Sequence, residues 1–155
     1  MLSYTWLVHA LAGIVLVLLS FAVAARQEEC KGLRVRKEIR DLTIDELNRY
    51  IHAVKTIYRR GVIDHFTMNH FVSGANVHGA PMFFVWHRNF IWEYENLLRE
   101  IDPTLTLPYW DWTLDAADPR MSQVFHRNYM GSTGVESDFD CLRDGPFRDW
   151  QATMT

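Results

Sequence analysis

Cysteine is scarce in this chain, and the ligand motifs that depend on it are absent. Two cysteines in 155 residues, Cys30 and Cys141, are too few for a disulfide-rich scaffold or a four-cysteine zinc site. The zinc-protease motif H-E-x-x-H is also missing. A net charge of −3 gives no reason to expect nucleic acid as a partner. The length suits one domain, because 155 residues are too few for two ordinary ones.

The N-terminus lacks the basic residues that usually precede a secretory signal, but it is otherwise typical of one. A nearly unbroken apolar run extends from Trp6 to Ala25, and Ala22-Val23-Ala24 offers small residues for cleavage. We expect residues 1–25 to be a signal peptide, cleaved after Ala24 or Ala25, and the protein to be secreted. Cys30 and Cys141 could then pair in the exported chain, or could pair elsewhere or stay unpaired.

An uncleaved membrane anchor is the alternative interpretation of the same run. Its length matches the ~20 apolar residues that a membrane-spanning helix needs. Basic residues also follow the run, and by the positive-inside rule they oppose export of what comes after it. They stand at positions 26, 31, 34, 36, 37 and 40. Contact with a membrane is expected only in this alternative.

Hydrophobic periodicity predicts a mostly α-helical fold. Thr43 and Glu46 have the spacing of a capping box, and apolar residues recur at helical intervals from there to about Arg60. Gly61 is expected to end this first helix. The pattern predicts a bundle-type arrangement of helices, followed from Thr113 onward by a loop-rich C-terminal stretch.

Two further helices are expected around a central loop. The second begins after Gly61 or at Asp64, and residues 73–76, Ser-Gly-Ala-Asn, are expected to break it because they favour turns. The third follows Pro81 and ends at Asp102-Pro103. Glu95 and Arg99 have the spacing of an i,i+4 ion pair on this third helix.

Three histidines cluster in this predicted helix–loop–helix segment. His70 lies on the second helix, His78 on the loop eight residues later, and His87 on the third helix nine residues after that. Neutral imidazole is a good ligand for copper, zinc, iron and nickel. The spacing alone is compatible with a metal site or with three unrelated packed histidines, and an all-imidazole set fits copper and zinc equally.

The motifs around these histidines carry a family resemblance. The pattern H-x7-H-G-x7-W-H-R-x-F, followed by P-Y-W-D-W at 108–112, resembles the first copper-binding half of the tyrosinase family. The resemblance runs from about Val35 to Trp150. It implies that residues 26–155 are the N-terminal part of a tyrosinase copper-binding domain, with a helical-bundle copper site that this chain leaves incomplete.

The resemblance also implies the ligands. In this family each copper of a coupled pair is held by three histidines, and the motifs place His70, His78 and His87 in these roles. His65, five residues before His70, is the alternative first ligand. Three neighbours are expected to support the ligands. Asp111 could orient a ligand or hold Arg88, or could simply end a helix, while Phe90 with nearby aromatic residues would keep the site dry.

The implied activity is oxidation of phenolic small molecules to o-quinones with O2. A second set of copper-binding histidines is not visible in the sequence, so we expect a fragment or a truncated product whose second copper half is supplied elsewhere. The alternative is a non-catalytic secreted domain that keeps one copper. A mononuclear zinc or copper enzyme with an open fourth position is a third interpretation. Whether this chain is itself an enzyme stays open at this point.

Overall fold

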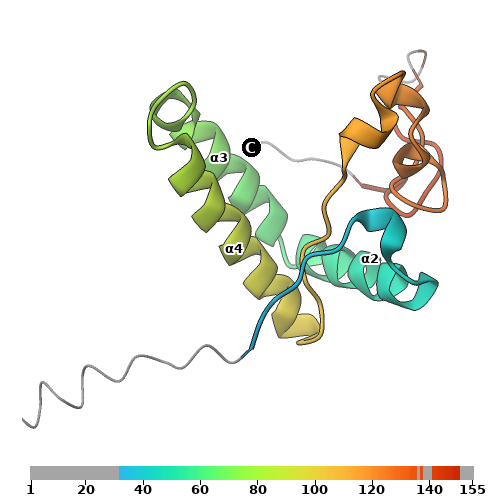
Figure 1. The fold of residues 1–155 in the computed structure, drawn as a ribbon, viewed down its shortest axis with the longest axis horizontal. Helices are drawn as coiled ribbons and strands as arrows, with labels where there is room; N and C mark the ends of the chain where they lie inside the picture. Colours follow the sequence, from blue (N-terminus) through green and yellow to red (C-terminus); the bar gives the residue numbers. More distant parts are fainter. Residues whose placement is uncertain (1–31, 136, 138–140, 151–155) are drawn as a thin grey trace, which may run out of the picture. The chain divides into compact units, whose positions relative to one another are not determined.

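Three α-helices dominate the part of the chain that the computed structural model describes, residues 32–135, 137 and 141–150. They are α2 (Ile44–Arg59), α3 (Val62–Val77) and α4 (Phe83–Ile101). The described residues contain no β-strand, only two isolated bridges. α3 and α4 run antiparallel, joined by a loop at one end, and α2 crosses them near the other end (Figure 1). The predicted mostly α-helical fold is confirmed.

α2 begins at the predicted capping box. The Thr43 side chain accepts a hydrogen bond from the Glu46 N–H at 3.2 Å, and the Glu46 carboxylate accepts one from the Thr43 N–H at 2.8 Å. Gly61 adopts φ 72°, a left-handed conformation that favours glycine, and there the chain turns into α3. Both predicted ends of this helix are therefore confirmed.

α3 is longer than predicted. It continues through residues 73–76 to Val77, so the expectation that this segment breaks the helix was wrong. The preference of serine, glycine and asparagine for turns costs a helix at most about 1 kcal/mol per residue, which packing outweighs. The His78 N–H donates to the Gly74 carbonyl at 2.9 Å and closes the last turn. His78 itself has left the helix, as predicted.

α4 and α2 share the main hydrophobic core. Leu98 of α4 is completely buried, and Ile57 of α2 is 1% exposed. Their buried neighbours are Ala53, Val54 and Leu105. α4 ends where predicted, with the Asp102 N–H donating to the Leu98 carbonyl just before Pro103. This core anchors the end of the α3–α4 hairpin that is distant from the histidines.

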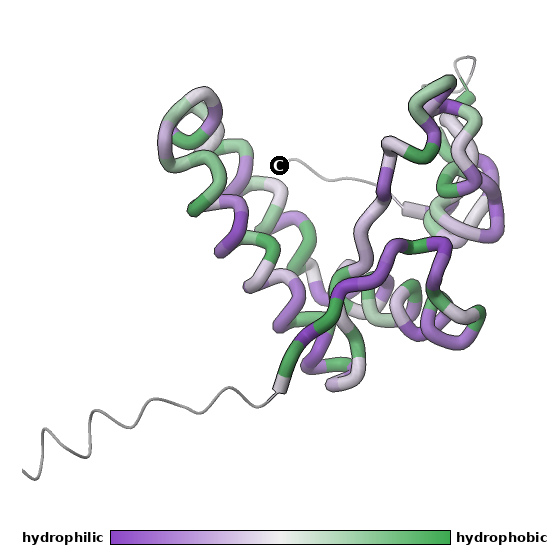
Figure 2. Tube along the Cα trace, in the orientation of Figure 1, coloured by the Kyte–Doolittle hydropathy of each residue, from purple (hydrophilic) through white to green (hydrophobic). Residues whose placement is uncertain are grey.

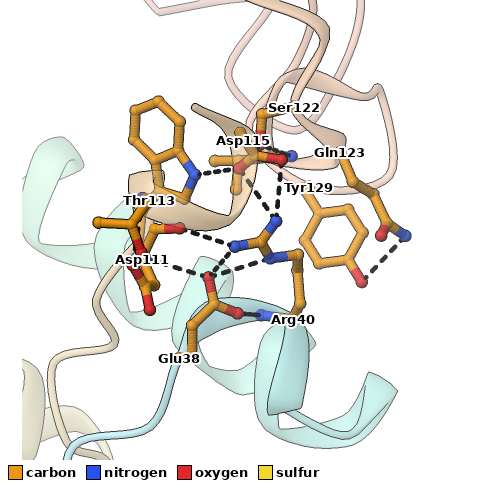
Figure 3. A network of polar contacts seen from close by, with 10 residues as sticks. Glu38, Arg40, Asp111, Thr113, Asp115, Ser122, Gln123 and Tyr129 are labelled. Atoms are coloured by element: carbon orange, nitrogen blue, oxygen red, sulfur yellow. Dashed lines mark hydrogen bonds and ion pairs between the residues drawn. The ribbon is translucent and has the colours of Figure 1, made fainter. Parts of the chain in front are cut away.

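A polar network fastens the segment before α2 to the P-Y-W-D-W segment. The Arg40 guanidinium lies between the carboxylates of Glu38 and Asp115, at 2.8 and 3.0 Å (Figure 3). The Trp110 indole N–H donates to Asp115 at 2.8 Å. Burial opposes ionisation of Glu38, but hydrogen bonds from Arg40 and from the Asp111 N–H outweigh it and lower the pKa of Glu38. The aromatic motif thus has a structural role in this network.

A second ion pair joins α4 to the segment before α2. The Glu95 carboxylate, 2% exposed, accepts hydrogen bonds from Arg36 at 2.7 Å and from the Leu107 N–H at 3.0 Å. The sequence paired Glu95 with Arg99, but Arg99 donates to the Leu105 carbonyl at 2.7 Å. Glu95 therefore joins three segments, because Arg36, α4 and Leu107 meet at one carboxylate.

None of the helices in the described residues is both long enough and apolar enough to cross a membrane. The expected signal peptide or anchor, residues 1–25, lies outside the described residues. So does Cys30, which leaves the disulfide prediction untested, while Cys141 is exposed.

Candidate metal centre

The three clustered histidines converge at the free end of the α3–α4 hairpin. His70 comes from the middle of α3, His78 follows the last residue of α3, and His87 lies one turn into α4. One ring nitrogen of each can be chosen so that all three lie within 4.8 Å of one another. The ring centroids are 5.0 Å apart for His70 and His78, and 5.2 Å apart for His78 and His87.

His87 is held by a backbone hydrogen bond of its own helix. Its Nδ1 lies 2.7 Å from the Phe83 carbonyl oxygen, one turn earlier. Because a carbonyl oxygen only accepts, this contact places the imidazole proton on Nδ1 and leaves Nε2 with a lone pair that can accept a hydrogen bond or bind a metal. Metal-binding histidines commonly donate their second N–H in this way, which fixes both the ring and its tautomer.

The Nε2 atoms of His70 and His87 face each other at 3.3 Å. Two imidazole nitrogens bound at about 2.0–2.1 Å to one metal in a tetrahedral arrangement lie about 3.3 Å apart. The pair is therefore spaced as two ligands of one ion are. With His78 as the third nitrogen and no sulfur or carboxylate in the group, the donors fit a metal that accepts imidazole, such as copper or zinc.

Aromatic rings surround the histidines. Phe83 packs on His87 with ring centroids 4.3 Å apart, and Phe90 and Trp86 lie 5.6 and 5.8 Å from the His70 ring. The sequence from 65 to 87 contains no Asp, Glu, Lys or Arg. Between His65 and His87 a bound cation would therefore meet imidazoles and aromatic rings, and this segment offers no carboxylate.

One side of His70 opens onto an apolar groove. The groove has a volume of about 430 Å³ and runs between α3 and α4 towards the C-terminal segment. Its walls include Phe66, Phe90, Tyr94 and Trp150. Burial raises the pKa of Tyr94 well above its ordinary value, so this hydroxyl stays protonated at neutral pH. The groove is wide enough, and apolar enough, to take an aromatic ring beside the histidines.

Comparison with known proteins assigns the chain to a family. The family model for the common central domain of tyrosinase matches residues 49–155. The chain belongs to the tyrosinase family. It is 35% identical over 126 residues to grixazone synthase of Streptomyces griseus, covering 74% of this chain and 40% of that protein. It is 34% identical over 123 residues to a tyrosinase of Streptomyces antibioticus, covering 74% and 44%.

A third relative lies outside the bacteria. A protein of Caenorhabditis elegans described as tyrosinase-like, tyr-3, is 36% identical over 124 residues, covering 77% of this chain and 17% of that protein. The chain thus spans less than half the length of the three relatives named here. Tyrosinases depend on copper, and the three-histidine group supplies the donors that copper requires.

The tyrosinase resemblance offered two candidates for the first ligand, and the geometry brings only one to the site. His70 belongs to the convergent group, whereas His65 is exposed and its ring lies 6.4 Å from that of Phe66. The five-residue separation places the two on different faces of α3. His52 and His126 are exposed and lie outside the group. Copper ligation by His70, His78 and His87 stays a prediction.

The three supporting residues named from the sequence differ in their surroundings. The ring centroid of Phe90 lies 5.6 Å from that of His70, and its role in keeping the site dry stays a prediction. The side chain of Asp111 accepts hydrogen bonds from the N–H and hydroxyl of Thr113 and begins a 3-10 helix. Arg88 is exposed, and among the described residues it is not bonded to Asp111. Asp111 thus has structural contacts at the start of a helix, whereas the alternative interpretation expected it to end one.

Two features of the tyrosinase fold were missed from the sequence. Glu95 was paired with Arg99 from their spacing and its burial was not predicted, although its place beside Ile91, Tyr94 and Leu98 on an apolar helix was a signal of burial. Gly74 was read as a helix breaker, whereas it lies inside α3 against the ring of His78. Nothing in the local sequence identifies that contact, because it depends on where the loop after α3 turns.

Proposed function

We propose that this chain is the first-copper half of a secreted tyrosinase-like oxidoreductase. It would bind one copper ion through His70, His78 and His87. The observation that carries this proposal is the convergence of three imidazoles, two of which have their Nε2 atoms 3.3 Å apart, in a group that contains neither sulfur nor carboxylate. In the complete protein the substrates would be monophenols or o-diphenols, together with O2.

The residues of this chain would prepare the site in three ways. The Phe83 carbonyl oxygen accepts a hydrogen bond from the Nδ1–H of His87, so that Nε2 carries the lone pair. Phe90 and Trp86, whose ring centroids lie 5.6 and 5.8 Å from that of His70, would keep water from one side of its ring. The apolar groove beside His70 would hold the ring of a phenol by contact with its walls. Copper, when bound, supplies the one-electron redox chemistry that these side chains lack.

A coupled two-copper centre needs three further histidines. The other described histidines, His52, His65 and His126, do not form a second group. We propose that further helices with their own histidines cover the exposed apolar side chains of the hairpin. Phe71 and Phe84, for example, are 72% and 80% exposed. Apolar surface of this kind is typical of a face that packs against a partner.

A non-catalytic secreted copper-binding domain is the alternative. It needs the same three histidines but no second metal. The two proposals differ in whether quinone forms from an o-diphenol when a second three-histidine group is present, because only the first proposal predicts quinone formation then. We expect none from the 155 residues alone, because one three-histidine group holds one copper. Steady turnover by a monomer, abolished in His87→Ala, would contradict the requirement for a second half.

Export is part of the proposal. It is supported by the apolar run from Trp6 to Ala25 and by its small-residue end. N-terminal sequencing of the protein from the culture medium should begin near Arg26. A membrane-bound product that still begins at Met1 would instead support the anchor.

Equilibrium dialysis against Cu²⁺ tests the ligand set. We expect one copper per chain, reduced strongly in His70→Ala, His78→Ala and His87→Ala. His65→Ala and His126→Ala are matched controls, because both residues are exposed and lie outside the group. Equal copper content in all five variants would overturn the proposal.

A further inference from the structure

Gly74 lies against the imidazole of His78. It occupies the last turn of α3, four residues before His78, and its carbonyl accepts the His78 N–H at 2.9 Å. A Cβ built on Gly74 would lie 3.3 Å from Nδ1 and 3.5 Å from Cε1 of the His78 ring. The 3.3 Å distance is shorter than nine in ten of the contacts that Cβ atoms make in proteins. One edge of the ring thus occupies the space that a side chain would need.

The helix itself gives no reason for glycine at this position. Glycine is the least favourable residue in a helix interior after proline, and alanine is the best. The glycines with positive φ in the described residues are at 32, 61, 79, 131 and 145, so Gly74 has ordinary helical geometry. The close approach of the His78 ring is the remaining explanation for a missing side chain.

We propose that Gly74 is a positioning residue of the copper site, an inference that rests on the proposed function. With no side chain on Gly74, the His78 ring folds back over the last turn of α3. That orientation directs a ring nitrogen towards those of His70 and His87. A methyl group at position 74 would push the ring away from the other two.

Gly74→Ala should have opposite effects on the metal-free protein and on the copper-bound protein. Without metal, His78 is exposed and follows the helix, so its ring moves aside at little cost and alanine improves the helix. With metal, the ring is fixed by the ion it shares with His70 and His87, so it cannot move without losing a ligand bond. Gly74→Ala should therefore stabilise the metal-free protein and weaken copper binding.

The test compares the full chain with two single variants, Gly74→Ala and Ala75→Gly. We expect Gly74→Ala to raise the Tm of the metal-free protein by about 2–4 °C and to raise the Kd for Cu²⁺, measured by chelator competition, by about 10–100-fold. Ala75→Gly, an exposed control on the same turn, should lower the metal-free Tm and leave the Kd unchanged. X-ray absorption should show about three histidine nitrogens on copper in wild type and about two in Gly74→Ala.

Each outcome decides one claim. Wild-type copper bound by three histidines, with an equal Kd in Gly74→Ala, overturns the role of Gly74 and leaves the proposed function intact. A wild-type chain that binds no copper, or binds it without these histidines, overturns the proposed function and this inference with it. A Gly74→Ala variant that loses metal-free stability and copper affinity together would show a general packing defect, which also contradicts the positioning role.

Discussion

Glu95→Gln should destabilise the fold by about 1–2 kcal/mol. The carboxylate is 2% exposed and accepts a charged hydrogen bond from Arg36 at 2.7 Å. A hydrogen bond to a charged group contributes about 1.5–3 kcal/mol. The Arg36 side chain is 34% exposed and regains water when the charge is removed, which reduces the loss. The glutamine oxygen still accepts from the Leu107 N–H, so that bond survives.

Glu95→Ala should cost more, about 3–4 kcal/mol. Besides losing the ion pair, it leaves the Leu107 N–H without this acceptor. It also leaves a cavity beside α4 where the side chain was. The free energy of unfolding of both variants is measured by urea titration, followed by circular dichroism, and the m-value should not change. Glu100→Gln is an exposed control on the same helix. A double-mutant cycle with Arg36→Gln should give a coupling of about 1–2 kcal/mol. Wild-type stability in Glu95→Gln, or a coupling near zero, would refute the role assigned to this pair.

Three further predictions follow from the core and its charges. Leu98→Ala, at a completely buried position, should reduce the free energy of unfolding by about 2–5 kcal/mol in the same urea assay. A hydrogen bond from Lys37 is the main cause that lowers the pKa of Glu46 from 4.5 to about 2. A hydrogen bond from Thr104 is the main cause that lowers the pKa of Asp102 from 3.8 to about 2. The two ionised carboxylates therefore stabilise the fold fully above pH 4.5, and the urea midpoint should fall as the pH drops from 4.5 to 2. Trp110→Phe removes the indole donor to Asp115 and should lower the Tm by a few degrees, measured calorimetrically.

Local rules were enough to predict the helices wherever sequence signals and packing agree. Thr43 and Glu46 fix the start of α2, and Asp102-Pro103 ends α4, because capping and proline sterics act within a few residues. The tyrosinase motifs predicted the convergence of His70, His78 and His87, whereas their helix–loop–helix spacing alone left it open. His70 and His65 could not be separated from spacing alone, and the turn of α3 decides between them.

Long-range contacts were not predictable from local pattern. Arg40 meets Asp115 across 75 positions, and Glu95 meets Arg36 across 59, so no periodicity connects either pair. The error at Gly74 has the same origin. Its turn preference is a local property, but the ring of His78 and the packing of α3 decide its conformation.

The copper-edge anomalous difference map of crystals grown with copper tests the central claim most directly. It should contain one strong peak per chain, about 2.0 Å from a ring nitrogen of each of His70, His78 and His87. A peak bound by His65 in place of His70 would correct the ligand set. The absence of any peak at the free end of the α3–α4 hairpin, in protein saturated with copper, would contradict the account.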